Sequence, residues 1–202
     1  MGKVLLIIGV IVVLLVVVCG IAVAGSYNGL VRLDQATQSQ WADVQSAYQR
    51  RLDLIPNLVE TVKGAAKFEQ GTLTAVTEAR AKVGQVSSEA IQNIANDPAA
   101  FKRFQEAQAG LSSALSRLMV VAEQYPELKA TQNFRDLQVS LEQTENRIGV
   151  ERRKFNEAAQ AFNTSRDSFP TVIVASIFGS KFQPKLYFAS EEGANKAPEV
   201  KF

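Results

Sequence analysis

Hydrophobic residues are distributed in two different ways along the chain. Residues 4–24, VLLIIGVIVVLLVVVCGIAVA, form one uninterrupted apolar run, whereas from residue 37 onward apolar residues recur every three or four positions. A helix over the apolar run would match the roughly 30 Å hydrocarbon core of a bilayer, at a rise of about 1.5 Å per residue. The pattern therefore predicts one N-terminal transmembrane helix followed by a helical domain.

Two other interpretations of the apolar run stay open. Ala22-Val23-Ala24 resembles the cleavage site of a secretory signal, and Cys19 would be the acylated residue of a lipoprotein. The length of the run favours an uncleaved anchor, and β-branched Val18 stands where a lipoprotein needs a small residue. Lys3 before the run, with Arg32 as the one positive residue soon after it, favours a cytoplasmic N-terminus and an extracytoplasmic domain.

The periodic part of the chain predicts four helices, over residues 26–66, 71–95, 98–124 and 127–168. Steps of three and four residues place one side chain per turn on a single face, the pattern of a left-handed helical bundle. The four faces are Thr37, Trp41, Val44, Tyr48, Arg51, Ile55, Leu58 and Val62; Leu73, Val76, Arg80, Val83, Val86, Ala90 and Ile94; Phe101, Phe104, Gln108, Leu111, Leu115, Leu118, Ala122 and Tyr125; and Phe134, Leu137, Leu141, Thr144, Ile148, Glu151, Phe155, Ala158 and Phe162.

The lengths of the predicted helices indicate their arrangement. Short turns require an antiparallel, up-down-up-down four-helix bundle. The first and fourth helices exceed the other two by about 15 residues, or roughly 20 Å, so the surplus should form a two-helix neck beside the membrane. We therefore predict an all-α protein with a transmembrane anchor at 1–25, a four-helix bundle at 26–168 and an irregular C-terminal segment near the membrane at 169–202.

Composition excludes several kinds of functional site. The chain has no histidine and one cysteine, so it cannot form an intramolecular disulfide, a Cys/His zinc site or a histidine-dependent catalytic triad. Neither of the phosphate-binding glycine motifs, GxGxxG and GxxxxGKS/T, occurs. A net charge of +2 with mixed signs argues against nucleic-acid binding. We expect a non-enzymatic protein without catalytic residues, metal or cofactor.

Several motifs along the helical part are specific enough to indicate a family. They are Trp41-Ala42-Asp43-Val44-Gln45, Tyr48-Gln49-Arg50-Arg51, Asp53-Leu54-Ile55-Pro56-Asn57-Leu58-Val59, Ala79-Arg80-Ala81, Tyr125-Pro126-Glu127-Leu128-Lys129, Thr144-Glu145-Asn146-Arg147-Ile148, Arg152-Arg153, Phe155-Asn156, Asn163-Thr164, Phe169-Pro170, Phe178 and Tyr187-Phe188. Over these motifs, from about residue 26 to residue 190, the chain resembles the LemA family. The resemblance implies a bacterial, membrane-anchored antiparallel helical bundle without an established biochemical activity.

Polar residues lie on or beside the predicted buried faces. They are Arg51, Asp53, Asn57, Arg80, Glu145, Asn146 and Arg147. Because buried charges need partners, we expect Arg51 and Arg80 to meet carboxylates such as that of Glu145 or Asp53. One interpretation is a structural polar layer that fixes the register between helices, and the other is a small pocket for an anion or a peptide terminus.

The C-terminal segment is apolar but too short to span a bilayer. Residues 171–178, TVIVASIF, are followed by Lys181, Phe182, Lys185, Tyr187 and Phe188. Three interpretations stay open. The segment packs on the neck and covers Trp41 and Phe155, or it lies at the membrane interface with its lysines towards anionic lipid, or it contacts another subunit.

These patterns lead to two hypotheses for function. The first is a scaffold, anchored by a single span in the bacterial inner membrane, which forms homo-oligomers or holds partner proteins at the cell envelope. It depends on an apolar neck left uncovered beside the apolar tail. The candidate oligomer or membrane contacts are Trp41, Phe155, Phe162, Phe178, Phe182, Tyr187 and Phe188. The second hypothesis is an envelope sensor or adaptor that binds a ligand in the polar layer and responds through helix shifts.

Overall fold

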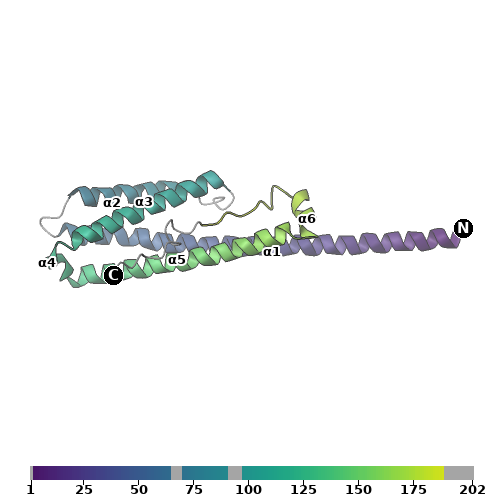
Figure 1. The fold of residues 1–202 in the computed structure, drawn as a ribbon, viewed down its shortest axis with the longest axis horizontal. Helices are drawn as coiled ribbons and strands as arrows, with labels where there is room; N and C mark the ends of the chain where they lie inside the picture. The colour runs from purple at the N-terminus through teal and green to yellow at the C-terminus, as the bar shows by residue number, and fades with distance from the viewer. Residues whose placement is uncertain (1, 65–69, 91–96, 189–202) are drawn as a thin grey trace, which may run out of the picture.

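A computed structural model describes residues 2–64, 70–90 and 97–188 of the chain. All regular secondary structure in these residues is helical, which confirms the predicted all-helical character. The helices are α1 (Gly2–Lys63), α2 (Gln70–Ala90), α3 (Pro98–Ala122), α4 (Pro126–Lys129), α5 (Gln132–Asp167) and α6 (Thr171–Ile177) (Figure 1). The predicted ends of the first two helices, at residues 66 and 95, and the tail at 189–202 lie outside the described residues.

α1 is a single helix that joins the apolar run to the domain without a break (Figure 1). The large apolar side chains between Val4 and Val23 are exposed, and this part of α1 is long and apolar enough to cross a membrane. From Leu30 onward the same helix carries a buried face of the domain. The predicted helix at 26–66 is therefore the continuation of the anchor rather than a separate element.

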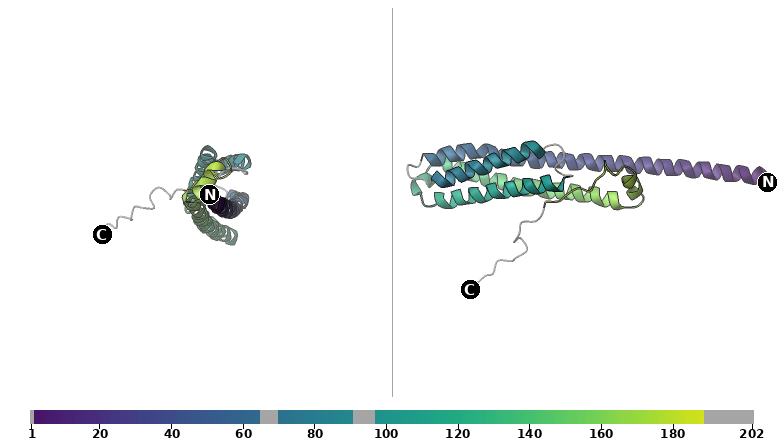
Figure 2. Two further views of the ribbon diagram at one scale, coloured as in Figure 1. Left: turned by 90° about the vertical axis from the view of Figure 1, so that its right-hand side faces the viewer. Right: turned by 90° about the horizontal axis from the view of Figure 1, so that it is seen from above.

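The long helices associate in two pairs (Figures 1 and 2). α5 lies along α1, and α3 lies along α2. One hydrophobic cluster receives side chains from all four: Leu52, Ile55, Leu58, Val59 and Val62 of α1; Leu73, Val76 and Val83 of α2; Ala107, Leu111, Ala114, Leu115, Leu118 and Ala122 of α3; and Phe134 and Leu141 of α5. Burying these apolar surfaces is the main favourable term in folding the domain.

The segment predicted as one helix at 127–168 is two helices. α4 ends at Lys129, α5 begins at Gln132, and Thr131 between them has extended backbone angles (φ −72°, ψ 134°). The prediction of a single helix is wrong here. Leu128 and Phe134 are both buried in the main cluster, but on one continuous helix their six-residue separation would point them about 120° apart. α4 instead closes the turn between α3 and α5.

Residues 182–188, which we call the strap, run back along α5 after α6. The side-chain amide of Asn156 donates to Phe188 O (3.0 Å) and accepts from Phe188 N (2.9 Å). The amide of Asn163 makes the same two contacts with the backbone of Lys185 (2.9 and 2.8 Å). Seven helical residues and three extended residues each advance roughly 10 Å, so the two asparagines match the strap in length.

The strap fills the face that we predicted to be an uncovered neck. Phe188 stacks on Trp41, with ring centroids 6.0 Å apart, and makes an edge contact with Phe155 at 5.5 Å. Phe182 packs against Phe162 in a second cluster with Leu30. All of these side chains are buried. The expectation of an exposed apolar neck is therefore wrong. The C-terminal segment covers it, as in the first of its three interpretations, and Phe101 and Phe104 of α3 also pack on Trp41.

α1 continues through Pro56, and this creates a contact with α2. Proline has no N–H, so the carbonyl oxygen four residues earlier, on Leu52, loses its usual helical donor. Nε of Arg80 in α2 donates to this oxygen at 3.2 Å. Arg80 thus replaces the hydrogen bond that Pro56 cannot make and links the two helices.

The link between Arg80 and Pro56 predicts a coupling in a double-mutant cycle. We expect Arg80→Met to lower the free energy of unfolding by about 1 kcal/mol in the native background, as is typical for a lost hydrogen bond. The loss should be smaller in a Pro56→Ala background, because alanine restores the N–H that satisfies Leu52. Denaturant unfolding of the full-length protein in detergent, followed by fluorescence, measures both. Equal losses would show that Arg80 does not act through this carbonyl.

The strap contacts predict that Asn156→Ala releases Phe188 from Trp41. The two hydrogen bonds between the Asn156 side chain and the backbone of Phe188 would be lost. Their loss should lower the free energy of unfolding by roughly 1–2 kcal/mol. Trp41 is the only tryptophan, so its emission should shift to longer wavelength as water reaches the ring. Asn146→Ala, at an exposed position of the same helix, is the matched control and should leave the emission unchanged. Unchanged emission in Asn156→Ala would contradict the assigned role.

Candidate functional site

One polar cluster surrounds the buried side chain of Arg51. This side chain is 1% exposed although the rest of its helix face is mostly apolar. Its Nη1 donates to Glu145 Oε1 and to Ser112 Oγ, both at 2.8 Å, and its Nη2 donates to Gln108 Oε1. The guanidinium carbon lies 5.2 Å from the centre of the Tyr48 ring. One carboxylate from α5 and two neutral acceptors from α3 therefore compensate the buried charge.

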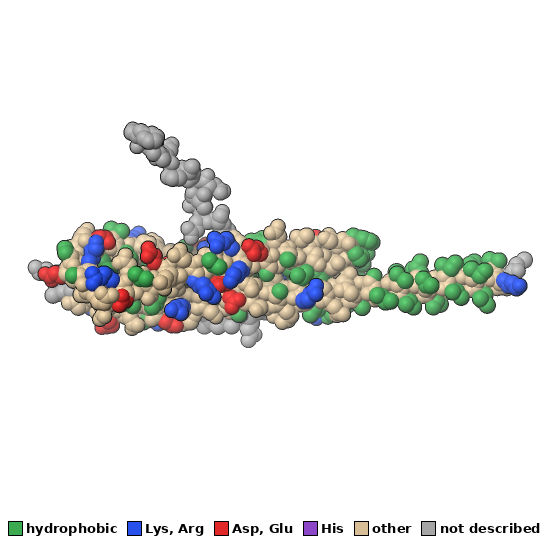
Figure 3. Space-filling model, turned by 90° about the horizontal axis from the view of Figure 1, so that it is seen from below, with side chains coloured by type: hydrophobic (Ala, Val, Ile, Leu, Met, Phe, Trp, Pro, Cys, Tyr) green, Lys and Arg blue, Asp and Glu red, His purple; other side chains and the backbone are tan. Residues whose placement is uncertain are grey.

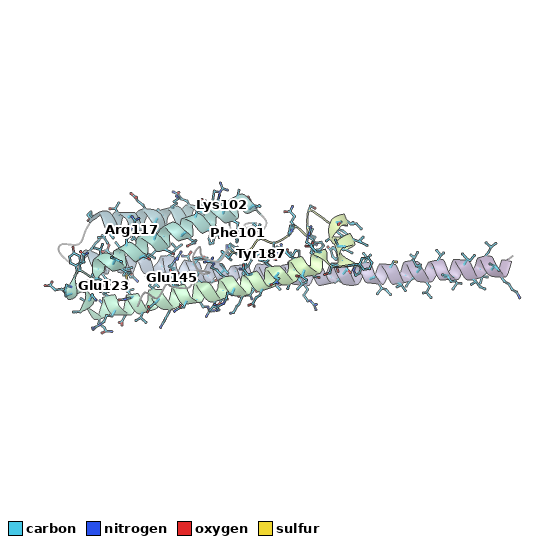
Figure 4. The ribbon with its side chains drawn as sticks, viewed as in Figure 1. Phe101, Lys102, Arg117, Glu123, Glu145 and Tyr187 are labelled. Carbon is cyan, nitrogen blue, oxygen red and sulfur yellow. The ribbon has the colours of Figure 1, made fainter. Side chains whose placement is uncertain are left out.

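This cluster joins α1, α3 and α5 at one level of the domain. A buried charge that loses its partner is strongly destabilising, so the pairing of Arg51 with Glu145 disfavours any other register of the helices. The expectation that Arg51 meets a carboxylate agrees with this geometry. Figure 4 labels Glu145 on α5, and this residue lines a cleft together with residues of α1 and α3.

The other residues of the predicted polar layer lie elsewhere. Arg80 meets the carbonyl of Leu52 where we had expected a carboxylate. Asp53 is exposed and accepts a hydrogen bond from Gln49 at 2.7 Å, one turn earlier on the same helix. The remaining members of the set are also on the surface: Asn57, Asn146 and Arg147. Of the seven predicted residues, the structure brings Arg51 and Glu145 together.

Glu151 is a buried charge that the sequence analysis did not single out. Its carboxylate is paired with Arg147 at 2.7 Å and with Lys154 at 3.3 Å, both on the same helix. Glu151 and Gln108 each occupy a position on a predicted apolar stripe. A polar residue on such a stripe is the signal that identified Arg51, and it would have identified these two as well.

Lys185 is a third buried charge, and it belongs to the strap. Its Nζ lies 2.6 Å from a carboxylate oxygen of Asp34 in α1 and 4.9 Å from the centre of the Phe162 ring. This ion pair holds the strap against α1, as the asparagines hold it against α5. Lys185 follows no periodic pattern, so the sequence carries no signal for its burial.

A cleft of about 850 Å³ opens beside Arg51, between α1, α3, α5 and the end of the strap. The charged side chains in its lining are Arg51, Lys102, Glu106, Glu145 and Arg152, of which Figure 4 labels Lys102 and Glu145. Within the described part of the chain, two buried donors of this lining, Nε of Arg51 and Nε2 of Gln108, have no hydrogen-bond partner. An anionic group is the kind of ligand that such donors bind.

A second hollow, of about 970 Å³, runs along the outer side of α2 and α3. We call it the α2–α3 groove. Much of its lining consists of small side chains: Gly71, Thr72, Ala75, Ala79, Ala107, Gly110, Ser113, Ala114 and Ser116. Small side chains allow another helix to approach closely, because the distance between helix axes depends on the residues at the contact.

The predicted aromatic contacts divide into two groups. Five are interior residues of a single chain: Trp41, Phe155, Phe162, Phe182 and Phe188. Phe178 and Tyr187 are exposed, although the Tyr187 hydroxyl accepts a hydrogen bond from Asn163 at 2.8 Å. Of the seven, these two present substantial surface to a membrane or another protein.

The described residues hold no group of three or more His, Cys, Asp or Glu side chains that could bind a metal ion. The buried carboxylate of Glu151 and the buried cations of Arg51 and Lys185 are all engaged in ion pairs. The buried charges of this part of the chain are therefore paired, although Nε of Arg51 and Nε2 of Gln108 keep unused donors.

Comparison with known proteins places the chain in a family. It is 29% identical to "Magnetosome protein MamQ 2" of Paramagnetospirillum magneticum over 188 residues, 86% of this chain and 68% of that protein. It is 27% identical to "Magnetosome protein MamQ" of Magnetospirillum gryphiswaldense over the same shares, and 25% identical to "Protein LemA" of Metamycoplasma hominis over 75% of this chain and 64% of that protein. Because residues 40–202 match the LemA family, this chain belongs to the LemA family.

Proposed function

We propose that this protein is a non-enzymatic, membrane-anchored scaffold that self-associates or holds partner proteins at the cell envelope. The observation that carries the proposal is the continuity of α1 from Gly2 to Lys63. Because the helix does not break, the anchor sets the direction of the domain, and the part from Ser26 to Lys63 rises by roughly 57 Å. A domain built on such a rod presents its sides at fixed heights above the membrane.

In this proposal residues 1–25 are the anchor and residues 26–168 form an antiparallel four-helix bundle. The C-terminal segment starts beside the membrane and returns along α5 to Phe188. The hydrophobic cluster shared by α1, α2, α3 and α5 supports the bundle. Lys3 before the apolar run and the single Arg32 soon after it support a bacterial inner-membrane protein with an extracytoplasmic domain. The names of the relatives describe no enzymatic activity, which supports a non-enzymatic role.

We infer that the α2–α3 groove is the contact face of the scaffold. The strap and α5 cover the inner face of α1, so the neck is no longer available for this role. The groove has the small side chains that helix packing favours, and charged residues of both signs, Glu78, Lys82 and Arg117, lie along it. A second copy presents the same groove, so a two-fold contact would be self-complementary in charge.

Photo-crosslinking in native membranes tests this proposal. A photoreactive residue at Ala75 or Ser113, both in the groove, should trap a second copy or a partner protein, visible as a band of higher mass. The matched control is Glu157, an exposed position on α5 outside the groove, which should give monomer. Monomer at every position would refute the scaffold, and equal adducts at Glu157 would refute the groove.

The second candidate is an adaptor that binds an anionic ligand, and the cleft beside Arg51 favours it. The two unpartnered donors and the cations Lys102 and Arg152 supply positive potential. The half-exposed carboxylate of Glu145 would turn away when a ligand anion replaces it on Arg51. Such an exchange would loosen the contact between α1 and α5, which is the helix shift that an adaptor needs.

Calorimetric titration of the full-length protein with inorganic phosphate tests this candidate. Binding should disappear in Arg51→Met and weaken in Lys102→Ala, and the matched control Lys82→Ala, on α2 outside the cleft, should bind normally. Absence of binding to the native protein would exclude it. If the cluster is purely structural, Glu145→Ala should lower the free energy of unfolding by about 3 kcal/mol, which is more than the loss in Arg51→Met. The reason is that Glu145→Ala leaves the buried guanidinium with only neutral hydrogen-bond partners.

A further inference from the structure

An apolar patch lies at the end of the domain next to the anchor. We call it the α6 patch, and its members are Phe169 (82% exposed), Ile173 (51%), Ile177 (69%) and Phe178 (42%). Ile173 and Ile177 are one turn apart and share a face of α6, whereas Val174 and Ala175 on its other side are buried. Figure 3 shows hydrophobic side chains at this end of the domain, where the bare segment of α1 emerges.

The packing of α5 on α1 fixes the height of this patch. Thr37 Oγ1 lies 3.4 Å from Ala158 O, and Arg51 lies opposite Glu145, so the two helices run antiparallel in a constant register. Extending that register from Thr37 towards the membrane brings Phe169 level with about Ser26, at the rise of 1.5 Å per residue common to both helices. The α5–α6 turn therefore lies just beyond Ala24, the end of the apolar run.

Aromatic contacts place α6 at the same height. The ring of Tyr27 lies 5.1 Å from that of Phe178 and 5.4 Å from that of Phe182. Lys181 Nζ donates to the Tyr27 hydroxyl at 2.6 Å. Tyr27 is one helical turn beyond Ala24, or roughly 5 Å along the axis. The headgroup layer is about 5–7 Å thick on each side of the hydrocarbon core, so α6 lies at headgroup depth.

We propose that the α6 patch inserts into the lipid interface, so that the protein holds the membrane at two points, the span of α1 and this patch. The occupant is lipid because the patch borders an exposed apolar helix and lies at the depth of the headgroups. Exposed phenylalanine and isoleucine beside Tyr27 and Lys181 form a combination of side chains that the interface favours. This proposal is independent of self-association through the groove.

A depth-sensitive fluorophore tests the proposal on the full-length chain. In a Cys19→Ser background, Ile177→Cys carries the label 7-nitrobenzoxadiazole, and the protein is reconstituted at low density in vesicles of phosphatidylcholine and phosphatidylglycerol. The matched control is Val139→Cys on α5, an exposed aliphatic position (49%) outside the α2–α3 groove. The register of α5 on α1 puts this residue level with about Asn57, far from the anchor. We expect blue-shifted emission at 177, quenched by a lipid that carries a nitroxide near its headgroup. The label at 139 should emit as in water and stay unquenched.

Two results would overturn the proposal. Emission at 177 that matches the label at 139 would place the patch in water. Blue-shifted emission that lipid nitroxide does not quench would assign the patch to another copy of the protein. The emission of Trp41 verifies that the labelled chain keeps the strap docked. Quenching at 177 can persist when groove crosslinks are absent, so failure of the scaffold and failure of this proposal are distinguishable.

Discussion

The packing of α5 along α1 is the interaction on which the other features of the domain depend. It places Glu145 opposite Arg51, carries Asn156 and Asn163 to the strap, and brings the α5–α6 turn to the membrane end of α1. Apolar side chains recurring once per turn supply most of the stabilisation, because both helices bury a continuous stripe. The Arg51–Glu145 pair adds selectivity, since a register that leaves Arg51 without a carboxylate would bury an unpaired guanidinium.

Much of the helical domain could be predicted because its buried positions recur with the period of an α-helix. The predicted stripes contain positions that are buried in the structure, such as Val44, Ile55 and Phe155. The strap could not be predicted in the same way, because an extended segment held by two asparagine side chains leaves no period in the sequence. Asn156 and Asn163, seven residues apart, have the spacing of an ordinary polar helix face. The expectation of an exposed neck arose because packing of the C-terminal segment stayed one of three interpretations and because Phe101 and Phe104 of α3 also reach Trp41.

The candidate site was predictable where a polar residue interrupts an apolar stripe, as at Arg51. The partners of Arg51 were harder to predict, because several carboxylates on α5 lie within one or two helical turns of the height of Arg51. Arg80 shows the limit of such reasoning. A carboxylate was the natural partner to expect for an arginine on a buried stripe. The acceptor it meets, the Leu52 carbonyl, is available because Pro56 stands four residues later and α2 faces that turn of α1.

The proposed membrane contact and the proposed scaffold would reinforce each other in physical terms. A single membrane-spanning helix can rotate about its axis, and its tilt is set by neighbouring contacts. Because α6 packs beside α1 rather than along its axis, a lipid contact at the α6 patch would resist that rotation. The α2–α3 groove of every copy would then face along the membrane in a defined direction. Copies that share a membrane plane and a fixed orientation lose less rotational freedom when they associate, so even a modest groove contact would suffice to hold them together.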